Sequence, residues 1–113
     1  MKIAVVGAAL TLALAPAALA QDYEAPVVSG LRATPKPALS FSVSEYALVR
    51  VVIRHRTHTV GSIEHAFMPG SGRIAVGRVR GAALPHGGYT ATVTANDAAH
   101  NRSAGQVVRF RVG

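Results

Sequence analysis

The stretch Tyr89–Ala95 (YTATVTA) alternates apolar and hydroxyl side chains without interruption. Because successive side chains of a β-strand point to opposite faces, this period of two predicts a strand with one buried and one solvated face. Threonine, valine and tyrosine also suit a pleated, half-buried surface. Strands of this kind belong to antiparallel sheets that pack on one side only, so the stretch predicts an all-β fold.

The same alternation extends outward from this stretch in both directions. It is clear in Leu39–Ser44, Val49–Arg56 and Val108–Val112, and weaker in Val27–Ala33, Thr59–Phe67 and Arg73–Arg80. Turn signals rich in Pro, Gly and Asn lie at 34–37, 68–72, 84–88 and 96–101. About seven short strands separated by such turns predict a two-sheet antiparallel sandwich. We expect its core to be Leu39, Phe41, Val43, Val49, Val51, Ile53, Tyr89, Ala91, Val93, Val108, Phe110 and Val112.

Residues 1–20 have the organisation of a helical signal peptide. Lys2 precedes the uncharged apolar run Ile3–Leu14, and Ala18 and Ala20 place small residues where signal peptidase needs them. The run is shorter than the roughly 20 residues of a membrane-spanning helix. We therefore expect cleavage after Ala20 and an exported domain at 21–113, periplasmic or extracellular, without a membrane span.

Composition further narrows the kind of protein that the sequence can encode. The chain contains no cysteine, which fits a bacterial exported domain better than a disulfide-supported animal one. Without the signal peptide it carries eleven basic and five acidic side chains, a net charge of +6. Such a surface attracts anionic polymers, although charge of this size also serves simply to keep a protein in solution.

Three segments resemble one family. They are Pro26–Leu31 (PVVSGL), Leu39–Glu45 (LSFSVSE) and Gly88–Asn101 (GYTATVTANDAAHN). Together they are similar to the bacterial immunoglobulin-like or fibronectin-III-like modules of exported surface proteins, such as those of actinobacteria. The resemblance implies an immunoglobulin-like sandwich in which the strand at 89–95 lies between those at 49–56 and 108–112. His100 stands where the family usually has glycine, and we expect the turn to shift onto Asn101.

Two groups of residues have structural roles under this resemblance. Tyr89, after Leu84–Gly88 (LPHGG), resembles the tyrosine corner, whose hydroxyl bonds back to the upstream backbone. Asp97 and Asn101 bracket the last turn, where their side chains bond to nearby backbone groups. The alternative for Asp97 is a calcium site shared with Asp22 or Glu24.

The histidines keep a second functional class open. His55 and His58 have the H-x-x-H spacing, and a transition metal needs two or three imidazoles that converge. Leu84, Pro85, Tyr89, Asp97, His100 and Gly105 follow the order found in periplasmic copper-carrier sandwiches. However, Asp-x-x-His replaces the expected Asp-x-His, and Gln21 replaces an N-terminal histidine. A copper carrier is therefore the alternative, and the primary prediction has no metal and no cofactor.

Catalysis has little support in the sequence. The carboxylates are dispersed, Ser71 lies outside a strand–elbow–helix context, and the Glu64–His65 pair points to opposite faces of a strand. We therefore predict a non-catalytic protein.

An arginine-rich sheet face is the candidate binding surface. Its predicted outward residues are Arg50, Arg54, Arg56, Thr90, Thr92, Thr94, Arg109 and Arg111. Guanidinium forks suit phosphate and carboxylate groups, so the expected partner is an anionic envelope polymer or another surface protein. No aromatic residue interleaves the arginines to stack bases, which disfavours nucleic acid. The alternative is that charged outer positions only discourage edge-to-edge pairing of sheets. The sequence leaves the oligomeric state open.

Overall fold

The structure is a computed structural model that describes residues 24–113, so the predicted signal peptide at 1–20 lies outside the described residues. The described part contains β-strands and no helix, and therefore no helix that is long and apolar enough to cross a membrane. The strands are β1 (Val28–Thr34), β2 (Ala38–Val43), β3 (Ala47–His55), β4 (His58–Phe67), β5 (Gly70–Ala75), β6 (Arg78–Val79), β7 (Ala82–Ala83), β8 (Gly87–Asn96) and β9 (Gln106–Val112).

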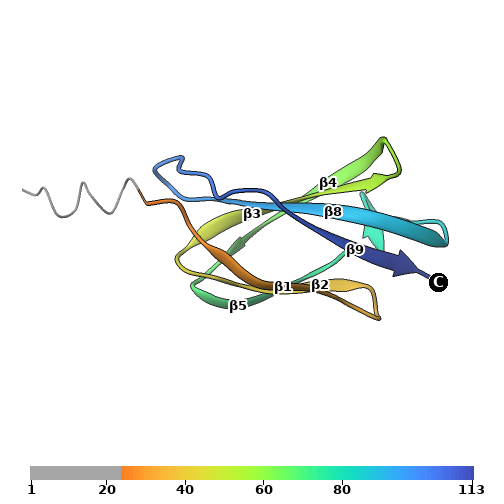
Figure 1. Ribbon diagram of the computed structural model, residues 1–113, viewed down its shortest axis with the longest axis horizontal. Coiled ribbons are helices and arrows are strands. Elements are labelled where there is room, and N and C mark those ends of the chain that lie inside the picture. Colours follow the sequence, from red (N-terminus) through yellow and green to blue (C-terminus); the bar gives the residue numbers. More distant parts are fainter. Residues whose placement is uncertain (1–23) are drawn as a thin grey trace, which may run out of the picture.

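Seven of these strands form two antiparallel sheets that face each other (Figure 1). One sheet has the order β1-β2-β5, the other has the order β4-β3-β8-β9, and β6 and β7 form a separate two-stranded ribbon. The predicted all-β, two-sheet antiparallel sandwich is confirmed. As expected, β8 lies between β3 and β9.

The core lies between the two sheets and follows the period of two. Along β3 the side chains of Val49, Val51 and Ile53 are fully buried, while Arg50 and Arg54 between them are exposed. Ten of the twelve predicted core residues are buried; Val108 and Val112 of the edge strand β9 are only half-buried against the core. The core also contains residues that the alternation did not single out: Val28, Ala47, Ile74, Val76, Val79, Leu84 and Ala95.

The prediction was wrong between residues 68 and 80. The expected turn at 68–72 is shorter, because Gly70, Ser71 and Gly72 already pair with β2 as the first half of β5. The expected strand Arg73–Arg80 ends at Ala75, after which the chain bends at Gly77 into the β6–β7 ribbon. Backbone hydrogen bonds hold this bend: the Val76 N–H donates to the Pro37 carbonyl, and the Leu84 N–H donates to the Gly77 carbonyl.

The topology gives the sandwich two distinct ends. One end, which we call the hairpin end, carries the β1–β2 turn, the β3–β4 turn, the β6–β7 ribbon, the start of β8 and the end of β9. The opposite end, which we call the loop end, carries the 44–46 and 97–105 connections and residues 24–27. Figure 1 shows the C-terminus at the hairpin end and the first described residues at the loop end.

Candidate functional site

Cross-strand pairing brings part of the predicted arginine face together. Arg54 on β3 pairs with Thr90 on β8, and Thr90 pairs with Arg109 on β9. Each of the three adjoins a buried residue on its own strand, so their side chains lie on the outer face of the four-stranded sheet. A threonine hydroxyl therefore lies between two arginines in one row.

The arginines of this face do not form one continuous group. The next row consists of Val52, Thr92 and Val107, and Val107 is 67% exposed. Beyond that row, Arg50 lies beside Thr94 and forms an ion pair with Glu64 on β4, with 4.0 Å between Nε and Oε2. Arg50 and Thr94 are thus separated from the other arginines, and Arg50 is already paired with a carboxylate.

Arg56 does not take the outward strand position that was predicted for it. β3 ends at His55, which pairs directly with His58, so Arg56 and Thr57 form a two-residue hairpin turn. Arg56 has a φ of 57° there. The left-handed conformation at the first position of such a turn normally selects glycine or asparagine. The alternation of the preceding residues gave no sign of where the strand would stop.

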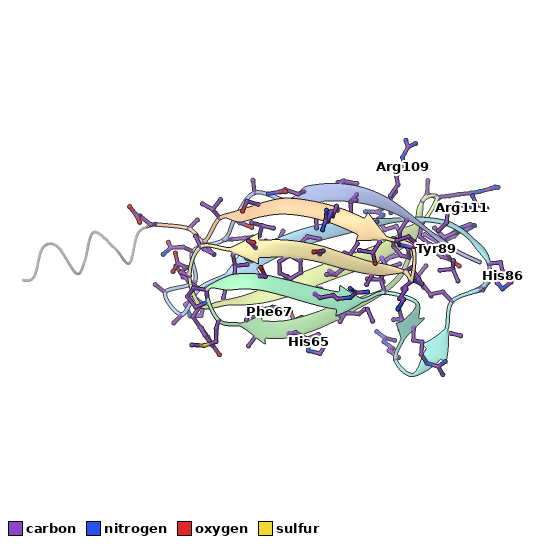
Figure 2. The ribbon with its side chains drawn as sticks, turned by 90° about the horizontal axis from the view of Figure 1, so that it is seen from below. His65, Phe67, His86, Tyr89, Arg109 and Arg111 are labelled. Atoms are coloured by element: carbon purple, nitrogen blue, oxygen red, sulfur yellow. The ribbon has the colours of Figure 1, made fainter. Side chains whose placement is uncertain are left out.

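A shallow depression of about 650 Å³ opens at the hairpin end of this face. We call it the Gly88 depression; it is lined by Arg56, Gly88, Tyr89, Thr90, Arg109, Phe110 and Arg111. Gly88 pairs with Arg111 across β8 and β9, and a Cβ added at Gly88 would lie 3.8 Å from an Arg111 guanidinium nitrogen. The Arg111 side chain therefore lies over the gap that the missing side chain leaves. Figure 2 shows Arg109 and Arg111 projecting away from the ribbon at this end.

Hydrogen bonds and ring contacts fix the backbone beneath the depression. The Tyr89 hydroxyl donates to the Pro85 carbonyl at 2.6 Å, which is the back-bond expected of this tyrosine. The Tyr89 ring stacks on the Phe110 ring with 5.5 Å between their centroids. The centroid of the His55 ring lies 5.3 Å from that of Tyr89. His55 Nδ1 also lies 3.1 Å from the Gly88 carbonyl oxygen, to which it donates. The arginines therefore project from a backbone that hydrogen bonds and ring contacts hold in place.

Charge is segregated along the molecule. The hairpin end carries Lys36, Arg54, Arg56, Arg78, Arg80, Arg109 and Arg111, and no Asp or Glu of residues 24–113 lies there. The carboxylates of Glu24, Glu45 and Asp97 lie at the loop end, together with Arg102. Within the described part of the chain, the one ion pair is that between Arg50 and Glu64. No side chain of residues 24–113 therefore neutralises the arginines of the Gly88 depression.

The Asp97 carboxylate organises the β8–β9 loop. Its Oδ1 accepts hydrogen bonds from the N–H groups of Ala99 and Asn101, and its Oδ2 accepts one from the Asn101 side chain. The structural role predicted for Asp97 and Asn101 matches these bonds, and nothing in them favours the calcium alternative. The expected shift of the turn was wrong: His100 itself takes the left-handed conformation, with a φ of 67°. The Asp97 bonds on both sides of His100 hold it there.

Asp97 makes the stability of the fold depend on pH. Partial burial alone would raise the pKa of Asp97, but the hydrogen bonds from Asn101 and Ala99 lower it below the usual value. A lowered pKa in the folded state means that the stabilisation is complete above about pH 4 and is lost as the pH falls through the folded-state pKa. We expect Asp97→Asn to be less stable than the wild type at about pH 6, and this difference to shrink by about pH 2.5.

Urea denaturation of both proteins at the two pH values measures this difference. Glu24→Gln is the matched control, because Glu24 is an exposed carboxylate at the same end of the sandwich. A deficit of Asp97→Asn that is equally large in acid would contradict the assignment of the effect to the ionised carboxylate.

The histidines do not assemble into a metal site. His55 and His58 are cross-strand partners at the β3–β4 turn. His65 lies on β4, and His86 and His100 lie at opposite ends of β8. Among residues 24–113, no three His, Asp or Glu side chains come together in a way that could hold a metal ion. Residues 24–113 therefore give the copper-carrier alternative no support.

Comparison of the chain with known protein families and with curated proteins finds no match.

Proposed function

We propose that this chain is an exported, non-catalytic module of the bacterial cell surface or envelope that binds an anionic polymer at its hairpin end. The observation that carries the proposal is a group of four arginines at the hairpin end of the outer sheet face, none of which pairs with a carboxylate of residues 24–113: Arg54, Arg56, Arg109 and Arg111. Guanidinium groups in this state are available to the phosphate, sulfate or carboxylate groups of a partner.

The sandwich supports the immunoglobulin-like part of the proposal. β8 lies between β3 and β9, and the Tyr89 hydroxyl donates a hydrogen bond to the Pro85 carbonyl. Both features agree with the resemblance of Gly88–Asn101 to the immunoglobulin-like modules. Export rests on the signal-peptide pattern of residues 1–20.

The placement of the candidate reactive groups supports a non-catalytic role. Ser71 lies on the edge strand β5 and pairs with Ser42, which is not the sharp turn that exposes a nucleophile. The Glu64 carboxylate lies toward Arg50 rather than toward its neighbour His65. A rigid surface for binding is the function that this arrangement fits best.

Reversing two charges of the arginine row tests the proposal. We expect the wild type to be retained on a column of an anionic polymer such as heparin, and Arg54→Glu/Arg109→Glu to lose most of that retention. Because each lost ionic contact removes one released counterion, the slope of log K against log salt should fall by about 2.

The other sheet offers a closely matched control. Arg32 and Arg73 flank Ser40 across β1, β2 and β5, as Arg54 and Arg109 flank Thr90. Arg32→Glu/Arg73→Glu therefore changes the net charge equally in a similar row on the opposite face, and we expect it to keep most of the retention. Equal loss in both double variants would show that retention comes from net charge alone, and the proposed surface would then be wrong.

A further inference from the structure

Arg56 occupies a backbone position that is unfavourable for arginine. In the two-residue turn between His55 and His58 it has a φ of 57°, a region in which a Cβ is crowded and which glycine occupies without cost. Residues held in such conformations cluster at functional sites, where the side chain has a use that offsets the strain. Arg56 lines the Gly88 depression together with Arg109 and Arg111.

Protection of a sheet edge explains only part of this cluster. β9 is an edge strand, so Arg109 and Arg111 could serve to discourage pairing with another sheet. Arg56 lies in a turn rather than on a strand edge, and a glycine would close that turn better. Like charges that share one surface also repel each other unless an anion neutralises them. The cluster therefore has the composition of a site for a negatively charged group.

The absence of a side chain at Gly88 makes room for such a group. The φ of Gly88 is not in the left-handed region, so the backbone of β8 does not require glycine there. The nearest atom to a Cβ at this position is the Arg111 guanidinium at 3.8 Å, which any larger side chain would displace. Thr90, the next outward residue on β8, adds a hydroxyl beside the gap.

We propose that the Gly88 depression binds one phosphate-class oxyanion of a longer anionic chain. Arg56, Arg109 and Arg111 are its ligands, and the Thr90 hydroxyl is an additional donor. The open, shallow shape favours a group within a chain over a free ion, because the chain can continue across the row to Arg54. This inference rests on the proposed function and deepens it, from a charged surface to one defined site.

The strain at Arg56 provides a test in which stability and binding change in opposite directions. Arg56→Gly removes one guanidinium and relieves the backbone, so we expect the unfolding midpoint to stay level or to rise by about 2–5 °C. The affinity for tripolyphosphate should fall by about two- to fivefold. It is measured by NMR titration, with the amide signals of Gly88, Thr90 and Arg111 as the probes.

Arg80→Gly is the matched control for this test. Arg80 has a φ of 55° in the turn of the β6–β7 ribbon and does not line the depression. The change therefore removes the same charge and relieves the same backbone conformation at the same end of the molecule. We expect tripolyphosphate affinity to change by less than about 1.5-fold. Equal weakening by both variants would overturn the site.

Gly88→Val tests the site independently of charge. Valine suits a strand, so the fold should remain intact while the side chain fills the gap and weakens tripolyphosphate binding at least about threefold. Unchanged binding would overturn the inference. Inorganic phosphate is the probe for a free ion, and we expect it to bind at least about tenfold more weakly than tripolyphosphate; equal affinity would overturn the chain-borne ligand.

The two proposals fail in different ways. If the polymer column retains the wild type but tripolyphosphate does not shift the Gly88, Thr90 and Arg111 amides, the defined site is wrong and the charged surface stands. If the column does not retain the wild type either, both are wrong.

Discussion

Replacement of Ile53 by alanine is expected to lower the free energy of unfolding by about 2–5 kcal/mol. Ile53 is fully buried on β3, an interior strand of the four-stranded sheet, where it pairs with Ala91 on one side and Gly61 on the other. These small partners cannot expand to fill the space that the larger side chain leaves, so the lost burial and the remaining cavity both contribute. A domain of this size has a total stability of about 5–14 kcal/mol, so the loss is a large fraction of it.

Urea denaturation monitored by circular dichroism measures this loss. Val107→Ala is the control on the same sheet, because Val107 is 67% exposed on the outer face. Its effect should lie within about 0.5 kcal/mol of zero. A loss below about 1 kcal/mol for Ile53→Ala would show that the inner face of β3 is not where the structure places it.

Gly72→Val is expected to destabilise the fold by about 3 kcal/mol through overpacking. Gly72 lies on β5 opposite Phe41, and a Cβ there would come within 2.8 Å of ring atoms of both Phe41 and Phe67. These two rings pack edge to face with 5.1 Å between their centroids and close over the glycine. A valine can be accommodated only if the rings separate.

Ser71→Val is the matched control for this change. It introduces the same β-branched residue one position earlier on β5, where the side chain is exposed. Strand propensity favours valine at both positions, so only the packing differs between them. We expect Ser71→Val to be neutral or slightly stabilising in thermal and urea denaturation. Equal stability of the two variants would contradict the packing of Phe41 and Phe67 over Gly72.

Gly72 also shows why part of the fold could not be predicted from the sequence. Alternation located β2, β3, β8 and β9, because each has one face in the core. Gly70, Ser71 and Gly72 have the composition of a turn, yet they pair with β2, since Gly72 fits beneath two aromatic rings from other strands. Such a fit depends on the tertiary structure and leaves no local pattern.

The candidate site, like the fold, could be predicted in part from the alternation of the sequence. The outward positions of Arg54, Thr90 and Arg109 follow from alternation, and their row follows from the strand order that the resemblance implied. The separation of Arg50 from them depends on its pairing with Glu64, and the role of Arg56 depends on where β3 turns. The pairing of Arg50 with Glu64 also depends on an irregularity in the β3–β4 register. Ile53 pairs with Gly61 and Arg54 pairs with Thr59, so β4 has one extra residue between these two pairs, which alternation does not reveal.

The separation of basic and acidic side chains between the hairpin end and the loop end gives the molecule an electric dipole along the sandwich. Near a negatively charged surface this dipole produces a torque that turns the hairpin end toward that surface before any contact forms. Productive encounters then become more frequent than random orientation allows, and added salt should slow association more than it speeds dissociation. Basic residues of the hairpin end that do not line the Gly88 depression, such as Lys36 and Arg78, would contribute to this kinetic effect on binding of the proposed polymer.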